Sequence, residues 1–469
     1  YNDNMNIKSH IKTLLGHNSD HNNKTFTANY PAINKAELLA VKADNMMITV
    51  GFDFGTHQTK VCIESKGGVE LSYTFMKYEG TDSKSYYTLP SIIGIGNDKH
   101  LYYGFMPKGF QGDIVRYFKQ GAFRGSSPDN SMTQELAIYY SIWYTAFILF
   151  DLEDIFGQNF VIQMGAPTDS SHILIAKQIA TRIIASAYKL VEDVFENDKQ
   201  RFLDADIDSL KNATEIVKYT DSIKEEYGLL VFPEAYACLK PLISQKKIAT
   251  GMSLMIDIGG GTTDISFFTI ENNVPQVYDF FSINKGLNYL TCADERVKNG
   301  YDSNVRSVSE IDKSRKTYFT KEVDTICNNI RSKLLNEFKH QTFLDKGRLF
   351  DALKNRPLVY CGGGSTFSIL RESHGGYQDK KQISDKEWDT KSIPQIEEII
   401  SKELCPILST AYGLAISTEH DNIKMKPFRD IFEGIRGLEE EKNIGNRKWA
   451  SFGDAYGGFN YSDDWDAWK

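Results

Sequence analysis

The sequence predicts a two-lobed α/β protein built from a duplicated unit. Two strand–turn–strand segments share one design, ITVGFDFGTHQTKVCIE over residues 48–64 and LMIDIGGGTTDISFF over residues 254–268. In each segment an apolar strand ends in an aspartate, a glycine-containing turn with threonine follows, and a second strand returns. A third glycine loop comes later in the chain. Duplication of one α/β lobe explains a repeat of this kind.

The composition is typical of a soluble globular protein with two or more domains. The chain has 469 residues, of which 41% are hydrophobic and 25% charged, and this length allows substantial cores. A formal net charge of −8 gives no general attraction to nucleic acid or to an anionic membrane. The six cysteines form no CxxC pair, disulfide framework or zinc signature. We therefore expect a cytoplasmic protein.

The order of segments predicts the domain organisation. We expect a flexible N-terminal extension over residues 1–46, lobe I over 47–250, lobe II over 251–404, a helix at 405–420 that returns to lobe I, and a C-terminal tail over 421–469. The tail alternates glycine, acidic and aromatic residues. We expect the two extensions to dock a protein partner. Packing of the tail on its own lobe, or disorder, is the alternative, and the oligomeric state is left open.

Periodicity and length predict the main helices. The apolar segment Leu136–Phe150 (LAIYYSIWYTAFILF) is shorter than a membrane span, which indicates a buried core helix. A further helix is expected over about 171–191, where apolar residues recur at helical spacing, and a last helix over about 395–417. The polar segment 375–389 is expected to be a surface loop.

The glycine turns of the two hairpins predict phosphate binding. Glycine allows backbone N–H groups to approach an anion closely, and the threonine hydroxyls can add donors. Two such turns from opposing lobes would hold the β- and γ-phosphates of a nucleotide. Ordinary hairpin turns are the alternative. The residues concerned are Gly55, Thr56 and His57 in the first turn and Gly259, Gly260, Gly261 and Thr262 in the second.

Asp53 and Asp257 are predicted to position Mg²⁺, largely through its water ligands. Mg²⁺ usually keeps several waters and is held by one or two carboxylates together with phosphates. A carboxylate at the end of an apolar strand is costly unless a cation or hydrogen-bond donors compensate it. Asx turns that stabilise the hairpins are the alternative interpretation.

The third glycine loop, LVYCGGGSTFSIL, covers residues 358–370. It follows a short apolar strand, and a helix is expected to begin at Ser365 or Thr366. After two phosphate hairpins this loop predicts a shelf for the nucleoside. The shelf residues are Gly362, Gly363, Gly364 and Ser365.

In this order the three motifs resemble the phosphate-1, phosphate-2 and adenosine loops of the actin, Hsp70 and sugar-kinase superfamily. VFPEAYACL over residues 231–239 is similar to the first connecting motif, and TAYGLAIS over 410–417 to the second. The resemblance covers residues 47–420. It implies two ribonuclease-H-like lobes around a central ATP cleft, with ATP or ADP and Mg²⁺ as ligands.

Within the superfamily, several segments resemble Hsp70. TLPSIIGI over 88–95 is similar to an Hsp70 segment with Pro-Ser before its strand. VRYFKQGAF over 115–123 resembles the stretch that carries the Hsp70 catalytic lysine, which implies this role for Lys119. A solvated surface lysine is the alternative. Arg331 and Lys333 could flank the adenine, as similar residues do in Hsp70, or lie on an exposed helix face.

Glu234 in the PEAYA segment is the candidate for polarising the attacking water. The resemblance places the hydrolytic carboxylate just before the second lobe. In phosphoryl transfer the protein mainly positions water and neutralises charge, so one oriented carboxylate, Mg²⁺ and a lysine can be enough. The candidate catalytic residues are Glu234, Lys119 and Asp257. Stabilisation of a helix N-terminus is the alternative role for Glu234.

Three functions compete. The principal hypothesis is an Hsp70-like ATPase that regulates a protein partner through nucleotide-dependent lobe closure. In PEAYA the glutamate follows the proline, an order that resembles ParM-type plasmid-segregation actins and the divergent Hsp70 branch, and no β-sandwich peptide-binding domain is recognised after residue 420. A polymerising actin homologue is therefore the alternative. A small-molecule kinase is third, because no counterpart of the catalytic aspartate of sugar kinases is found.

Overall fold

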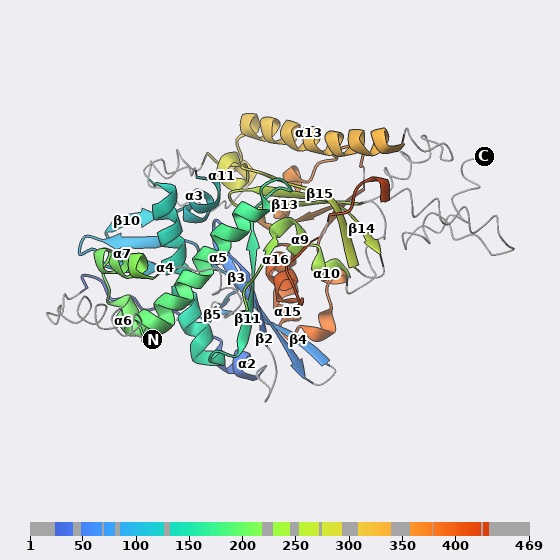
Figure 1. Cartoon of the computed structure of the whole chain (residues 1–469). Coiled ribbons are helices and arrows are strands. Elements are labelled where there is room, and N and C mark those ends of the chain that lie inside the picture. The colour runs from blue at the N-terminus through green and yellow to red at the C-terminus, as the bar shows by residue number, and fades with distance from the viewer. Residues whose placement is uncertain are drawn as a thin grey trace, which may run out of the picture. The chain divides into compact units, whose positions relative to one another are not determined.

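A computed structural model gives the structure of the chain (Figure 1). It describes residues 24–40, 48–67, 70–79, 85–125, 132–217, 228–243, 253–271, 274–292, 308–338, 357–377, 379–423 and 425–430. The predicted lobe boundary at 250/251 and much of both predicted extensions lie outside these residues. The chain divides into two compact units: unit 1 is Tyr1–Ala166, Leu174–Phe232 and Leu414–Asp421, and unit 2 is Pro167–Ile173, Pro233–Gly413 and Asn422–Lys469.

Unit 1 is built on a sheet with the strand order β12-β11-β2-β3-β4, and β7 pairs with β3 beside it. The central strand β2 is parallel to β11 and antiparallel to β3, and β3 is antiparallel to β4. All six residues of β2 are buried, because both faces of the central strand are covered. The strands are β2 Ile48–Asp53, β3 Gln58–Gly67, β4 Glu70–Phe75, β7 Leu89–Pro90, β11 Phe160–Ala166 and β12 Leu230–Pro233.

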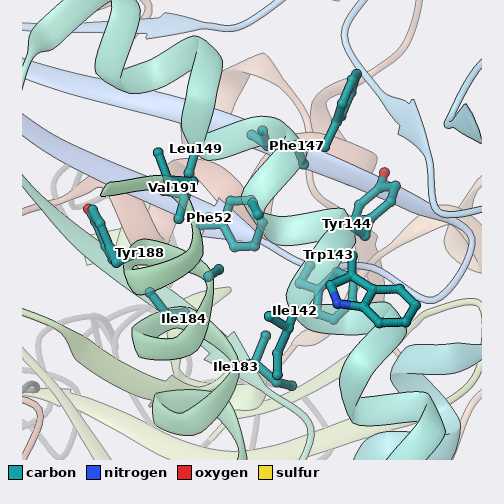
Figure 2. Close-up of a cluster of buried hydrophobic side chains, with 14 of the residues drawn as sticks. Phe52, Ile142, Trp143, Tyr144, Phe147, Leu149, Ile183, Ile184, Tyr188 and Val191 are labelled. Atoms are coloured by element: carbon teal, nitrogen blue, oxygen red, sulfur yellow. The ribbon is translucent and has the colours of Figure 1, made fainter. Parts of the chain in front are cut away.

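The predicted core helix is confirmed as α4 (Gln134–Phe156), in which every residue from Tyr140 to Phe150 is buried. Helix α5 (Ile173–Lys189) confirms the second predicted helix and continues into a π-helical turn, η1 (Leu190–Val194). Figure 2 shows Phe52 of β2 among side chains of α4 and α5 in the core of this unit. Among the described helices, none combines the length and apolar character that a bilayer crossing requires.

Residues 24–40 depart from the prediction of a flexible extension. They contain strand β1 (Ala32–Ile33) and helix α2 (Lys35–Ala40). Strand β1 pairs with β5, and Leu38 is fully buried. The aromatic and apolar residues of this segment pack on unit 1, which gives it order that its polar composition did not indicate.

Small sheets and helices complete unit 1. Two three-stranded sheets have the orders β1-β5-β6 and β10-β8-β9. Ser417, beyond the α16 helix, donates its backbone N–H to Glu64 on β3 at 3.2 Å. The remaining elements are β5 Tyr78–Glu79, β6 Ser85–Tyr86, β8 Ile93–Gly96, β9 Leu101–Tyr103, β10 Gly112–Val115, α3 Phe118–Arg124, α6 Lys199–Leu203 and α7 Ile207–Ile216.

Unit 2 is built on a sheet with the order β15-β14-β13-β16-β17. Central strand β13 is antiparallel to β14 and parallel to β16, and β14 is antiparallel to β15. Numbered along the chain, the strands of each sheet therefore have the order 3-2-1-4-5. The strands of unit 2 are β13 Ser253–Ile258, β14 Thr263–Glu271, β15 Val274–Ile283, β16 Pro357–Cys361 and β17 Asp379–Gln382.

One face of the unit 2 sheet is covered by the long helix α13 (Lys313–Phe338), whose apolar side chains join Ile256, Ile265 and Phe267 in one core. Figure 1 shows α9, α10 and α16 on the other side of this sheet. The remaining elements are α9 Glu234–Ala237, α10 Lys240–Ile243, α11 Leu287–Leu290, η2 Val308–Glu310, η3 Gly363–Thr366, η4 Ser368–Leu370, η5 Asp385–Glu387, η6 Thr390–Ser392, α15 Ile396–Ser401 and α16 Cys405–Ala415.

Three expectations for unit 2 are corrected. The segment 375–389 was expected to be a loop but contains the edge strand β17, whose polar residues pair in parallel with β16. The helix expected over 395–417 is two helices, α15 and α16. The third glycine loop leads into the short 3₁₀ turns η3 and η4 rather than an α-helix.

Candidate functional site

The first glycine turn connects β2 to β3 in unit 1. Its glycine is required by the close approach of the backbone, because a Cβ on Gly55 would lie 2.1 Å from the carbonyl oxygen of Gln58. Thr56 is buried and His57 is half-buried in the same turn. The turn therefore has the tight backbone that the sequence predicts for an anion-binding loop.

Asp53 ends strand β2 and is buried, but its charge has a partner that the sequence reasoning missed. Lys60 lies directly opposite Asp53 in the antiparallel register of β2 and β3. Its Nζ donates to Oδ2 of Asp53 at 2.7 Å. The lysine offsets much of the cost of burying this carboxylate. The role of Asp53 toward Mg²⁺ stays a prediction.

Ser91 supports the first turn from the TLPSIIGI segment. Its hydroxyl donates to the carbonyl of Gly55 at 2.7 Å and lies 3.0 Å from the hydroxyl of Thr59. Its backbone N–H donates to the carbonyl of His57 at 2.8 Å. Strand β7, which precedes Ser91, pairs with the start of β3. The segment therefore fixes the turn through two hydrogen bonds and contacts the start of β3 through a third.

Lys119 lies near this turn on helix α3. It is buried, with 4% of its surface exposed, and its Nζ is 5.9 Å from the ring centre of Phe54, the first residue of the turn. Phe54 is packed between Phe118 and Tyr144. This burial differs from the alternative of a solvated surface lysine. Unit 1 thus brings Asp53, the turn and Lys119 into one neighbourhood.

The second glycine turn connects β13 to β14 in unit 2. The N–H of Gly259 donates to the carbonyl of Thr262 at 2.9 Å. The carbonyls of Gly259 and Gly260 accept from the first N–H groups of helix α11, on Leu287 and Asn288, at 3.0 and 2.8 Å. Helix α11 therefore fixes this turn, whereas a serine hydroxyl and a β-strand fix the turn of unit 1.

The third glycine loop lies directly against Asp257. Gly362 has a φ of 78°, and a Cβ there would lie 2.1 Å from Oδ1 of Asp257. A Cβ on Gly364 would lie 2.3 Å from Cγ2 of Ile258. Thr410 of α16 donates its hydroxyl to Oδ2 of Asp257 at 3.2 Å. Unit 2 therefore joins the second and third loops at one buried carboxylate.

A second acid, Asp264, lies opposite Asp257 in the register of β13 and β14. Both carboxylates project from the same face of the sheet, since residues directly paired across two strands share a face. Asp264 accepts a hydrogen bond from the Thr262 hydroxyl at 3.0 Å. The sequence prediction missed Asp264, although its position directly after the turn in GGGTTD was the available signal.

Glu234 is the first residue of helix α9, immediately after Pro233, and is buried with 7% of its surface exposed. The interaction with Cys361 lowers the pKa of the Cys238 thiol at the end of the same helix, but burial raises it, and the charges of Asp257, Asp264 and Glu234 raise it further. The three carboxylates therefore lie around one position of unit 2. Oxygen donors of this kind fit a hydrated Mg²⁺.

The two basic residues predicted beside the adenine lie on helix α13. Lys333 is ion-paired with the buried Asp279 of β15 at 2.6 Å and lies over the ring of Phe281. A guanidinium nitrogen of Arg331 would lie 3.2 Å from a Cβ on Gly376, in the turn before β17. Their role toward a nucleoside stays a prediction.

No protein-family model and no curated protein sequence matches the chain. Its structure is similar to that of an archaeal actin homologue, Ta0583, with 15% sequence identity and a TM-score of 0.36, and the match covers 82% of this chain and 99% of that chain. It is also similar to MreB5 of Spiroplasma citri bound to ADP, with 15% identity and a TM-score of 0.33, and that match covers 77% of this chain and 97% of that chain. An exopolyphosphatase from Cytophaga hutchinsonii is also similar, with 11% identity, a TM-score of 0.26 and coverage of 67% of each chain.

These identities and TM-scores are low, so the fold is assigned from the strand order of the chain itself. Both large sheets have the order 3-2-1-4-5, with strand 1 antiparallel to strand 2 and parallel to strand 4. The chain has a duplicated ribonuclease-H-like fold. Each unit has its glycine turn at the same place, between strands 1 and 2, with an aspartate at the end of strand 1. The predicted duplication is therefore confirmed.

Proposed function

We propose that the chain binds ATP with Mg²⁺ and hydrolyses it. The observation that carries the proposal is the position of Asp257, whose carboxylate lies between the turn after β13 and the glycine loop after β16. A carboxylate there can orient Mg²⁺-bound water while backbone N–H groups of the flanking loops receive phosphate and nucleoside. The equivalent turn of unit 1 offers a second phosphate-binding loop.

The proposed chemistry divides among few residues. Asp257 and Asp264 supply oxygen ligands to the hydration shell of Mg²⁺, with Asp53 as a further candidate. Glu234 orients the attacking water, and Lys119 neutralises charge that develops on the transferred phosphoryl group. Burial of these groups supports such roles, since charges act more strongly where water is excluded.

The proposed biological output is regulation of a protein partner by nucleotide-dependent lobe closure, as in an Hsp70-like ATPase. Phe428, in the described start of the tail, stacks on Phe267 of unit 2 with ring centres 5.4 Å apart. The partner would engage the remaining parts of the two extensions. None of the six cysteines forms a disulfide, which supports the proposed cytoplasmic location.

Isothermal titration of the full chain with ATP, with and without Mg²⁺, tests the proposal. We expect Mg²⁺-dependent binding that Asp257→Asn weakens at least about tenfold, equivalent to ~1.4 kcal/mol. Asp379→Asn, an exposed acid on β17, serves as the matched control and should bind normally. Wild-type protein that binds no ATP with Mg²⁺ present would overturn the proposal.

A polymerising actin homologue is the alternative function. The observation in its favour is the order at the start of α9, where Pro233 is the N-cap and Glu234 follows it, as in ParM-type proteins. Right-angle light scattering distinguishes the two functions. ATP-dependent scattering that reverses after hydrolysis would favour the filament, whereas constant scattering at every protein concentration favours the Hsp70-like function.

A further inference from the structure

Three potential metal ligands converge in unit 2, although the sequence contains no metal-binding spacing. They are the thiols of Cys238 and Cys361 and the carboxylate of Asp257, and their ligand atoms all lie within 4.8 Å of one another. All three residues are buried. Among the described residues, this is the one group of three or more histidine, cysteine or acidic side chains with such close ligand atoms.

The fold itself brings these side chains together. Cys361 ends β16 and is paired with Asp257 at the end of β13 in the parallel register, so both project from the same face of the sheet. Cys238 is the C-cap of α9, and Ser266 on this face of β14 donates to the carbonyl of Ala235 in the same helix. Helix α9 therefore presents Cys238 to the pair.

The thiols already interact with the group. The Cys238 thiol donates to the carbonyl of Ala235 at 3.5 Å, and the Cys361 thiol interacts with Cys238 and with Asp257. Burial raises the pKa of the Cys361 thiol, and the interaction with Cys238 and the charge of Asp257 raise it further. The interaction with Cys361 lowers the pKa of the Cys238 thiol, but burial and the nearby carboxylates outweigh it.

We propose that Cys238, Cys361 and Asp257 form a binding site for a thiophilic divalent cation of the Zn²⁺ class. Two thiolates and one carboxylate are a ligand set that suits Zn²⁺, with the fourth tetrahedral position left to water. Zn–S bonds of about 2.3 Å place two ligand sulfurs about 3.8 Å apart. The two sulfurs, which lie within 4.8 Å of each other, must therefore approach each other by about 1 Å at most.

Cation binding at this site releases the protons of the two thiols and involves no change of oxidation state. The cation forms bonds to the two sulfurs and to one carboxylate oxygen, and each thiol releases its proton to water. The carboxylate also distinguishes this site from a simple pair of thiols. A disulfide between Cys238 and Cys361 would form without Asp257, whereas a bound cation would be coordinated by all three side chains.

The site shares Asp257 with the proposed nucleotide site, and this consequence rests on the proposed function. A cation held by Asp257 and two thiolates occupies the carboxylate that would orient Mg²⁺-bound water. Zn²⁺ should therefore weaken the binding of ATP with Mg²⁺ in the wild-type chain. The weakening should disappear in Cys361→Ser, which keeps Asp257 but lacks one thiolate.

Titration of the reduced full chain with Co²⁺, without nucleotide, tests the site directly. We expect one Co²⁺ per chain, with the near-ultraviolet thiolate-to-metal absorption and visible bands of tetrahedral coordination, and displacement by one equivalent of Zn²⁺. Cys238→Ser and Cys361→Ser should each lose these bands and at least about 100-fold in affinity, since even loss of an outer-shell partner costs about 10- to 100-fold. Cys327→Ser, which replaces a buried cysteine of α13, should bind as the wild type does.

The absence of thiolate absorption with Co²⁺ in the reduced wild type would overturn the proposal, as would bands that survive in both cysteine variants. A Cys238–Cys361 disulfide that forms with peroxide, found by mass spectrometry together with no Co²⁺ binding after reduction, would assign the pair to redox chemistry instead. If a serine variant does not fold, Cys238→Ala and Cys361→Ala replace it, and the Zn²⁺-dependent rise in Tm of the wild type should be absent from both.

The two proposals fail separately. Loss of Co²⁺ binding with normal binding of ATP would remove only the metal site. Normal Co²⁺ spectra in a chain that binds no ATP would remove only the nucleotide proposal.

Discussion

At the scale of single residues, buried charge is the main feature of unit 2. Asp257, Asp264 and Glu234 are all buried, and their negative charges act together on one thiol. Burying several like charges is costly unless cations or hydrogen-bond donors compensate it, and the hydroxyls of Thr262 and Thr410 supply two such donors. In the first turn, Lys60 pairs with Asp53.

Replacement of Glu234 by glutamine tests its proposed role in hydrolysis. Glutamine keeps the size of the side chain but accepts a proton poorly, so we expect near-normal binding of ATP and a kcat reduced by about 100-fold or more. Single-turnover hydrolysis measures the effect. Glu397→Gln, an exposed first-turn glutamate of α15, should leave kcat unchanged. A normal rate in Glu234→Gln would exclude the role.

Substitution of Gly362 by alanine tests how closely the third loop approaches Asp257. Alanine there would need a φ of 78° and a Cβ 2.1 Å from a carboxylate oxygen, so we expect Gly362→Ala to lower the free energy of unfolding by about 1–3 kcal/mol. Gly363→Ala is the matched control, because its nearest atom would be 3.9 Å away. Urea denaturation without nucleotide should separate the two variants, and equal stabilities would contradict this account of the loop.

At the scale of elements, the same hairpin is supported differently in each unit. The carbonyl oxygens of the second turn accept hydrogen bonds from helix α11. The carbonyl of Gly55 in the first turn accepts one from Ser91, which follows β7. Helix α11 can approach closely because residue 286 is a glycine. A Cβ on Gly286 would lie 2.6 Å from the carbonyl oxygen of Gly259. Each turn therefore depends on an element outside its own hairpin.

Ser91→Ala should loosen the first turn without removing any predicted ligand. Loss of the hydrogen bond to Gly55 should lower the free energy of unfolding by about 1 kcal/mol. It should also weaken ATP binding, because the turn loses its fixed geometry. Thermal unfolding and titration with ATP measure both effects. Ser332→Ala, where the hydroxyl lies on an exposed part of α13, should change neither; unchanged ATP affinity in Ser91→Ala would argue against the supporting role.

At the scale of the whole molecule, one buried acid links stability to pH. Glu153 of α4 is buried, and burial together with the charge of Glu192 raises its pKa to about 8 from 4.5. The folded state therefore binds a proton more tightly than the unfolded state. Its contribution to stability is complete below about pH 4.5 and is lost as the pH rises through 8.

Glu153→Gln should remove this pH-dependent loss of stability. We expect the free energy of unfolding of the wild type to fall between pH 5 and 8.5 more steeply than that of the variant, because glutamine stays neutral. Urea denaturation at several pH values measures both slopes. Glu196→Gln, just beyond η1 and exposed, is the control and should keep the wild-type slope. Parallel curves for all three chains would contradict the assignment.

The sequence by itself determined the repeat, the two glycine turns, the strand-end aspartates and the buried helix α4. These features depend on local physics, namely the backbone freedom of glycine and the lengths of the apolar runs that form strands and the helix. Each copy of the repeat, and each of the other features, is visible within about 20 neighbouring residues.

Only the tertiary structure decided the rest. Strand β17 is polar and lies at a sheet edge, so its sequence resembles a loop, and its pairing with β16 alone reveals it. The partners Lys60, Asp264 and Cys361 follow from strand register. Cys238 reaches Asp257 only because α9 packs on that face of the sheet. Contacts between residues far apart in the chain depend on strand order, register and helix packing, which no local pattern contains.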